Sequence, residues 1–132
     1  MDRIEESDDI EQIDDRDLAR LVARFYATVR NDALIGPVFN DAIDDWPEHL
    51  EKLTDFWSSL MLTSGRYKGA PMMAHLKHRS RITSAMFERW LALWREATIA
   101  EMPPGIAASM QMKAERIAQN FKLALKLDLE KV

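Results

Sequence analysis

Four stretches of the sequence repeat apolar residues every three or four positions, the period of an amphipathic α-helix. The first begins with Asp14 or Asp15 as its N-cap and ends near Asn31 and Asp32. Its apolar stripe consists of Leu18, Leu21, Val22, Phe25 and Val29. Tyr26 lies on one edge of this stripe. The pattern therefore predicts either an inward hydroxyl that needs a hydrogen-bond partner or a tyrosine at the rim of the core with its tip in water.

The second helical stretch follows a broken apolar segment, where Gly36 and Pro37 leave room only for a short helical piece near residues 33–40. Asp45 is the expected N-cap of this second helix. Its apolar stripe consists of Leu50, Leu53, Phe56, Trp57, Leu60 and Met61. His49 lies near the start of the same stripe, so the spacing places an imidazole on the buried face.

The third stretch begins near Thr83 or Ser84 and ends where two prolines and a glycine follow Met102. Its buried positions are Phe87, Trp90, Leu91, Trp94 and Ala97. The last helix carries Ile106, Met110, Ala114, Ile117, Ala118, Phe121 and Leu125 on one face. No segment alternates with period two for long enough to form a strand. The sequence therefore predicts an all-α fold, with further short helical pieces near residues 33–40 and 70–78.

Length and composition favour one folded domain with a substantial core. A chain of 132 residues buries roughly two thirds of the surface of its unfolded state. The absence of cysteine excludes thiolate metal sites, iron-sulfur clusters, cysteine nucleophiles and covalent haem attachment through Cys-x-x-Cys-His. Only His, Asp, Glu, Met and Tyr side chains remain as metal ligands.

Charge is concentrated at the start of the chain. Residues 1–17 hold nine acidic and two basic side chains, whereas the remaining 115 residues have a net charge of +3. We expect residues 1–14 to be a flexible acidic leader and residues 15–132 to form the folded domain. The start resembles no signal peptide, and no apolar run reaches membrane length, so we expect a soluble, cytoplasmic and monomeric protein. The scattered basic residues do not indicate nucleic-acid binding.

The three histidines lie within a window of thirty residues, at positions 49, 75 and 78. No glutamate stands three residues before any of them, which excludes a di-iron bundle, and the zinc-protease motif His-Glu-x-x-His is absent. His75 and His78 are spaced to form a metal-binding pair, although no third ligand is in evident register. A haem needs only one imidazole and an apolar cleft. The simplest alternative for His75, which stands among apolar residues, is a half-exposed histidine on a short helix.

A series of separated motifs resembles the group III truncated haemoglobins. The motifs are Phe25-Tyr26 with Val29-Arg30, Ile35-Gly36-Pro37-Val38-Phe39, Trp46-Pro47-Glu48-His49-Leu50 with Phe56-Trp57, Tyr67-Lys68-Gly69-Ala70-Pro71 before His75, and Phe87-Glu88-Arg89-Trp90-Leu91. They occur in the same order as in that family and extend from about residue 18 to residue 125. The resemblance implies a shortened globin in which two pairs of antiparallel helices enclose a haem.

The resemblance also implies roles for individual residues. His75 corresponds to the proximal ligand of the haem iron, Tyr26 and Trp90 to distal hydrogen-bond donors, and His49 to a distal histidine that acts as a gate. The expected lining residues are Phe25, Leu53, Phe56, Trp57, Tyr67 and Met72. The basic segment at residues 77–81 departs from the family pattern. We interpret it either as a contact of His78 or Arg79 with a haem propionate or as a solvated loop.

The function implied by the resemblance is non-covalent binding of haem b and reversible binding of dioxygen or another diatomic ligand. Oxygen transport, nitric oxide dioxygenase activity with a reductase partner, and peroxidase-like activity all remain open, because the same distal donors serve binding and turnover. A different class is a cofactor-free helical module whose tryptophans build a core or a partner surface.

Overall fold

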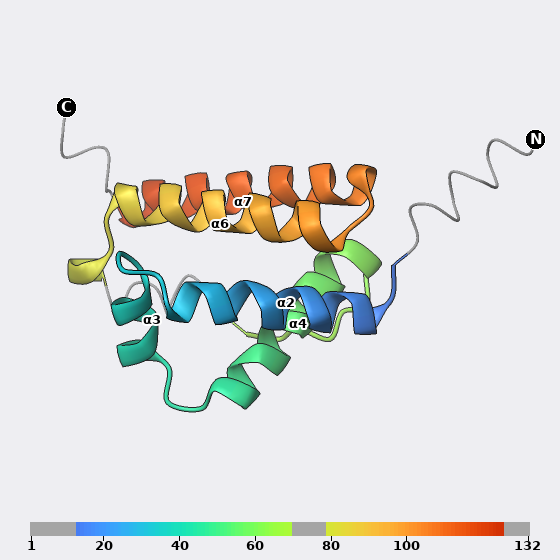
Figure 1. Cartoon of the computed structure of the whole chain (residues 1–132), viewed down its shortest axis with the longest axis horizontal. Coiled ribbons are helices and arrows are strands. Elements are labelled where there is room, and N and C mark those ends of the chain that lie inside the picture. The colour runs from blue at the N-terminus through green and yellow to red at the C-terminus, as the bar shows by residue number, and fades with distance from the viewer. Residues whose placement is uncertain (1–12, 70–78, 126–132) are drawn as a thin grey trace, which may run out of the picture.

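The computed structural model describes residues 13–69 and 79–125, which form helices in two layers (Figure 1). One layer contains α2 (Asp15–Arg30), α3 (Gly36–Ala42) and α4 (Trp46–Leu62), and the other contains α6 (Ser84–Glu101) and α7 (Pro104–Leu125). A short 3-10 helix, η1 (Arg79–Arg81), leads into α6. These two ranges contain no strand, and the predicted all-α fold is confirmed.

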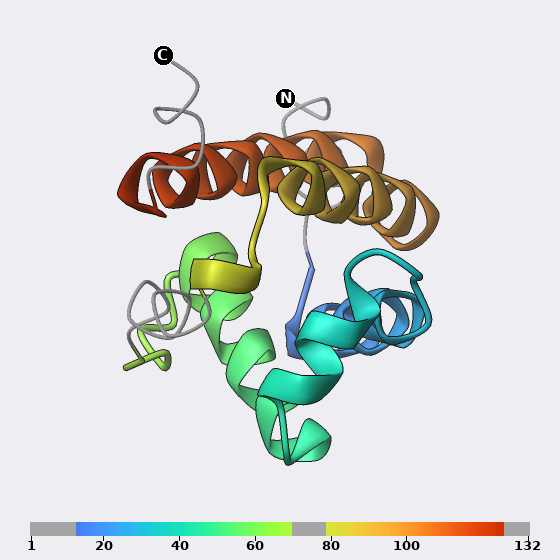
Figure 2. The ribbon, with the colours of Figure 1, turned by 90° about the vertical axis from the view of Figure 1, so that its left-hand side faces the viewer.

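The centre of the described fold is α2, which packs against α3 and α4 in its own layer and against α6 in the other. Figure 2 shows the antiparallel pair α6 and α7 lying across the layer that holds α2 and α4. The inner face of α2 therefore packs against helices of both layers. None of the described helices is both long enough and apolar enough to cross a membrane.

Local capping fixes the starts of the three helices that contribute to the candidate site. The Asp14 carboxylate accepts the Asp17 backbone N–H at 3.0 Å, and the Asp17 carboxylate accepts the Asp14 N–H at 3.0 Å. This reciprocal capping box identifies Asp14 rather than Asp15 as the N-cap of α2. The side chains of Asp45 and Thr83 cap α4 and α6 by accepting the backbone N–H three residues further on.

Gly36 allows the chain to turn back sharply after α2. A Cβ atom at this position would lie 2.8 Å from the Arg30 carbonyl oxygen and 3.0 Å from that of Val29, closer than a side chain can approach. The short helix α3 therefore begins at Gly36 and lies against the end of α2. Its bounds fall later than the predicted piece near residues 33–40 because this close contact fixes where the helix begins.

The core is built on the apolar stripe of α2, whose members Leu18, Leu21, Val22, Phe25 and Val29 have no exposed surface. Above this stripe the rings of Trp57 and Trp94 stack at 4.6 Å, and the Trp94 indole N–H donates to the Met110 carbonyl at 3.2 Å. The prediction that Leu60 is buried is wrong, because 38% of its surface is exposed. The buried face of α4 is centred on Trp57 and Ser58, so Leu60 lies at its edge.

Candidate functional site

Tyr26 is the buried polar group at the centre of the candidate site, with only 4% of its surface exposed. Burial raises the pKa of its hydroxyl to about 12, and a hydrogen bond with the Trp90 side chain partly opposes this effect. An indole N–H can only donate, so the Tyr26 oxygen accepts this bond and its own proton remains for another acceptor.

Trp90 reaches Tyr26 from α6 and is half-buried. Its ring lies parallel to that of Trp94, with 6.1 Å between centroids, and edge-on to Phe25 at 5.8 Å. Phe25 is in turn edge-on to Tyr26 at 4.7 Å. Two aromatic neighbours, Phe25 and Trp94, therefore hold the Trp90 ring in place.

His49 of α4 is a further neighbour of Tyr26. The two rings are edge-on, with 6.1 Å between centroids, and His49 is half-buried. Tyr26 therefore has Trp90 of α6 as one neighbour and His49 of α4 as another. The structure thus brings together the three residues that the sequence predicted as distal, although they come from three different helices.

The predicted lining residues divide into two groups. Leu53 and Phe56 are half-buried on α4, and the ring of Tyr67 packs edge-on against Phe56 at 5.2 Å. Burial raises the pKa of the Tyr67 hydroxyl. Phe25 and Trp57 are instead 0% and 2% exposed, within the core. Phe25 and Trp57 therefore belong to the core next to the site, whereas Leu53, Phe56 and Tyr67 keep part of their surface exposed.

Four predicted residues belong to the stretch around the proximal position. Met72, His75 and His78 lie outside the described residues, and Arg79 is described only as the first residue of η1. Their roles as pocket lining, iron ligand and propionate contacts stay predictions from the resemblance.

Two aromatic residues near the site were part of the family motifs but had no predicted role in the site. Phe39 of α3 lies 5.7 Å from Tyr26. Trp46, the first residue of α4, lies 6.0 Å from Tyr26 and 5.6 Å from His49 between ring centroids. A signal for Trp46 was present in the sequence, because a residue three positions before His49 shares its helix face. Phe39 has no such local signal, since α3 meets α2 only in the fold.

A polar cluster fixes the loop that follows α4. Arg66 donates to both carboxylate oxygens of Asp15, at 2.8 and 2.9 Å, and to Asp55 at 3.1 Å. The fully buried Ser58 hydroxyl lies 3.1 Å from Asp15 and 2.9 Å from Ser64. Hydrogen bonding from Arg66 holds the pKa of Asp15 below its ordinary value. The cluster joins the start of α2, the end of α4 and the loop that leads toward residues 70–78.

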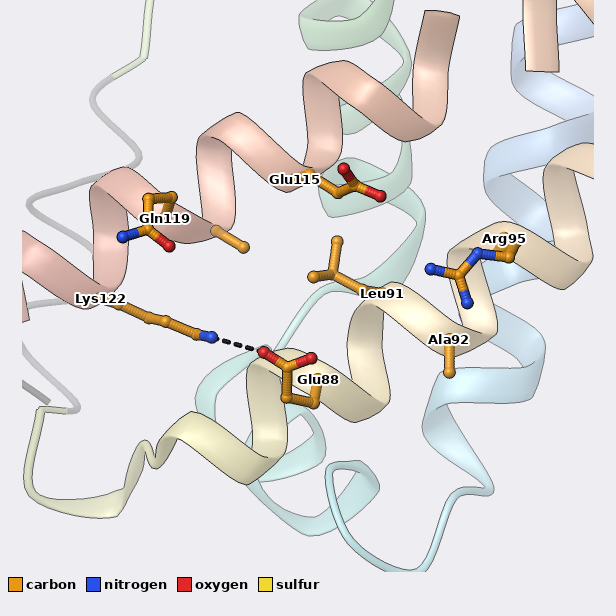
Figure 3. Close-up of a pocket in the computed structure, with 8 residues that line it drawn as sticks. Glu88, Leu91, Ala92, Arg95, Glu115, Gln119 and Lys122 are labelled. Atoms are coloured by element: carbon orange, nitrogen blue, oxygen red, sulfur yellow. Dashed lines mark hydrogen bonds and ion pairs between the residues drawn. The ribbon is translucent and has the colours of Figure 1, made fainter. Parts of the chain in front are cut away.

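A groove of about 450 Å³ lies between α6 and α7, and Figure 3 shows the side chains that line it. Its lining mixes charges, including an ion pair between Lys122 and Glu88, with Arg95 and Glu115 nearby. Because successive helix positions turn by about 100°, Glu88 and Arg95 lie on the side of α6 opposite Trp90. The groove is therefore separate from the cluster around Tyr26.

Comparison with known proteins places this arrangement in a family. The model of the bacterial-like globin family matches residues 11–126, and the chain belongs to that family. The group 3 truncated haemoglobin ctb of Campylobacter jejuni is 33% identical over 116 residues, which cover 85% of this chain and 91% of the relative. A crystal structure of the group III truncated haemoglobin from Campylobacter jejuni has a TM-score of 0.78 and 33% identity, covering 87% and 93% of the two chains. The resemblance to group III is confirmed.

Family membership implies a haem cofactor, and the described residues suit one. Several large apolar side chains that pack against the core are only half-buried, which suits a site that a flat apolar group covers. They are Phe39, Ile43, Leu50, Leu53, Phe56, Met86 and Trp90. The polar groups of Tyr26 and Trp90 meet beside this apolar surface. The chain is therefore a haem-binding globin.

Proposed function

We propose that the protein binds haem b non-covalently through His75 and holds dioxygen or another diatomic molecule beside Tyr26 and Trp90. The observation that supports this most strongly is the pairing of these two residues, because a buried Tyr26 oxygen that accepts the Trp90 N–H keeps its own proton as a donor. Haem supplies, when bound, an iron that binds such ligands and shifts more electron density onto dioxygen than onto carbon monoxide. The Tyr26 O–H then donates to the partial negative charge on the ligand, and the Trp90 N–H is shared between the Tyr26 oxygen and the ligand.

His49 is proposed to control access to these donors. It stands in the first turn of α4 and is half-buried, so its ring can turn from Tyr26 toward water without a large desolvation penalty. In the inward position it narrows the space beside Tyr26. We therefore assign it to ligand association, and we assign ligand retention to Tyr26 and Trp90.

The cationic segment before α6 is proposed to place His78 or Arg79 near the haem propionates. Arg81 at the end of this segment donates to Asp41 of α3 at 2.9 Å, which fixes that end beside α3. A cation close to a carboxylate forms a strong charge-assisted bond. This proposal depends on His75 being the proximal ligand.

The decisive experiment is reconstitution of the purified chain with haem, followed by the same reconstitution of His75→Ala and His78→Ala. We expect a Soret band and a five-coordinate ferrous spectrum for the wild type. His75→Ala should lose most haem affinity and recover it with added imidazole, which replaces the missing ligand. His78→Ala should keep the wild-type ferrous spectrum and serves as the matched control.

Two results would contradict the proposal. A wild-type chain without a Soret band after reconstitution would support a cofactor-free helical module. A His75→Ala variant with an unchanged ferrous spectrum, together with loss of that spectrum in His78→Ala, would assign the proximal bond to His78.

A further inference from the structure

Arg30 and Trp46 form a contact at the outer edge of the distal cluster. The guanidinium carbon of Arg30, the last residue of α2, lies 4.5 Å from the centre of the Trp46 ring. Arg30 is exposed, whereas only 9% of the surface of Trp46 is exposed. An arginine over an indole face is a cation–π contact, the best of the common pairings. We call this contact the Arg30–Trp46 latch.

The Trp46 ring connects this contact with the distal residues. Its plane is perpendicular to the His49 ring, at 89° and 5.6 Å, and it also lies 6.0 Å from Tyr26. Trp46 and His49 are three positions apart in the first turn of α4, so both project from one face of the helix. Trp46 therefore has exposed Arg30 on one side and both His49 and Tyr26 on the other.

The position of Trp46 limits how His49 can move. To turn away from Tyr26, the His49 ring must leave its contact with the Trp46 edge or move together with Trp46. Arg30 covers one face of Trp46 and joins it to the end of α2, and Asn40 of α3 donates to the Arg30 carbonyl at 3.1 Å. The first turn of α4 is thus held to a fixed part of the fold.

We propose that the Arg30–Trp46 latch keeps His49 in its inward position and so slows ligand access to Tyr26 and Trp90. This rests on the proposed function of His49 as the gate. Arg30 itself touches neither distal donor in the described contacts, so its removal acts on association and leaves retention unchanged. The same side chain also lies in the last turn of α2, where a cation stabilises the helix end. Loss of that effect should speed amide exchange in the last turn of α2, whereas loss of the latch should speed it in the first turn of α4.

The test compares Arg30→Gln with Arg16→Gln in the haem-loaded ferrous protein. Arg30→Gln removes the cation, and Arg16→Gln removes an equal charge from the exposed first turn of the same helix. We expect Arg30→Gln to raise the carbon monoxide association rate two- to fivefold, the change that about 0.5–1 kcal/mol of cation–π energy corresponds to. Its dissociation rate should stay unchanged. Arg30→Lys, which keeps a cation at the end of α2, should retain most of the wild-type rate.

A second readout does not depend on ligand binding. Amide hydrogen exchange in the first turn of α4 should become two- to fivefold faster in Arg30→Gln and remain unchanged in Arg16→Gln, because only the first variant releases Trp46. This measurement uses the haem-loaded ferric protein without added ligand. Equal exchange in Arg30→Gln and wild type, or equal acceleration in both variants, would overturn the latch.

The His49→Leu background distinguishes failure of the latch from failure of the gate. If the latch acts through His49, adding Arg30→Gln to His49→Leu produces no further increase in the association rate. A further twofold or larger increase in that background would overturn the latch. If His49→Leu alone leaves the association rate unchanged, the proposed gate is wrong, and so is the effect of the latch on ligand access. The exchange measurement still tests the contact between Arg30 and Trp46 in that case.

Discussion

Trp90 and Trp94 lie one turn apart on α6 and belong to two differently packed regions. Trp94 is 1% exposed, stacks on Trp57 at 4.6 Å and donates to a backbone carbonyl on α7. Trp90 is half-buried, and its polar group is directed to Tyr26. The same side chain therefore completes the core at one position and presents a hydrogen-bond donor at the other.

The difference shows how a small globin can combine stability with an open site. Around Trp94 every surface is covered by protein, so packing holds the helices together. Around Trp90 the apolar surface is incomplete, and edge-on aromatic contacts from Phe25 and Trp94 fix the ring instead. The first region should dominate the stability of the chain, and the second should dominate how it treats a ligand.

The largest expected effect is on stability, from Trp94→Ala. This variant should lower the free energy of unfolding of the haem-free chain by about 3–5 kcal/mol, because it leaves a cavity among covered side chains. Trp90→Ala should cost at least about 1 kcal/mol less, since part of its ring is already exposed. Urea unfolding followed by circular dichroism measures both. Equal losses in the two variants would mean that the two regions are packed alike.

The next prediction concerns ligand retention. Losing one hydrogen bond to a partly charged acceptor costs roughly 1.5–3 kcal/mol, so Tyr26→Phe and Trp90→Phe should each speed dioxygen dissociation about ten- to hundredfold. Carbon monoxide carries less charge, and its dissociation should change less. Stopped-flow replacement measures both rates in the same samples.

The double variant sharpens this prediction. Because Trp90 donates to the Tyr26 oxygen and both groups serve one ligand, the effects of Tyr26→Phe and Trp90→Phe should not be additive. If dissociation of dioxygen and carbon monoxide accelerates equally, the two side chains act by obstructing the exit, and the role assigned to hydrogen bonding is wrong.

Local signals in the sequence predicted most of the described fold. Asp45 and Thr83 cap α4 and α6 as expected, because an N-cap depends on residues within one helical turn. The apolar stripe of α2 was also predicted correctly, because helical periodicity is likewise a local signal. Leu60 was assigned wrongly because Ser58, a polar residue, occupies the centre of the buried face of α4, where Asp15 and Ser64 satisfy its hydroxyl.

The contacts between helices could not be predicted from periodicity. The pairing of Tyr26 with Trp90 was expected only through the resemblance to a family. The contact of Arg30 with Trp46 requires the end of α2 to meet the start of α4, and nothing local to either residue specifies that meeting. The bonds from Arg66 to Asp15 join residues 51 positions apart in the sequence. Such contacts follow from the fold as a whole.

An ion pair next to Trp90 in the sequence also holds this part of α6 in place. Arg89 donates to Asp32 at 2.7 Å, and the Asp32 carboxylate also accepts the backbone N–H groups of Leu34 and Ile35 at 3.0 and 3.1 Å. Desolvation alone would raise the pKa of Asp32, but these three donors outweigh it and hold the pKa below its ordinary value of 3.8. The ion pair joins this part of α6 to the turn after α2.

The smallest expected effect is therefore a pH-dependent loss of stability in Asp32→Asn. At pH 7 the variant should be less stable by about 1 kcal/mol, because the asparagine oxygen still accepts backbone N–H groups but no longer pairs with Arg89 as an anion. A carboxyl group with a lowered pKa stabilises the fold above its unfolded pKa, and this contribution disappears as the pH falls through the folded pKa. The difference between wild type and Asp32→Asn in urea unfolding should thus be constant above the ordinary pKa of 3.8 and shrink as the pH falls below it, through the lowered folded pKa. Asp44→Asn, which removes an exposed carboxylate after α3, should show no comparable loss at pH 7. A difference that persists unchanged at the lower pH would mean that the substitution acts through packing at the turn, with no contribution from the ion pair.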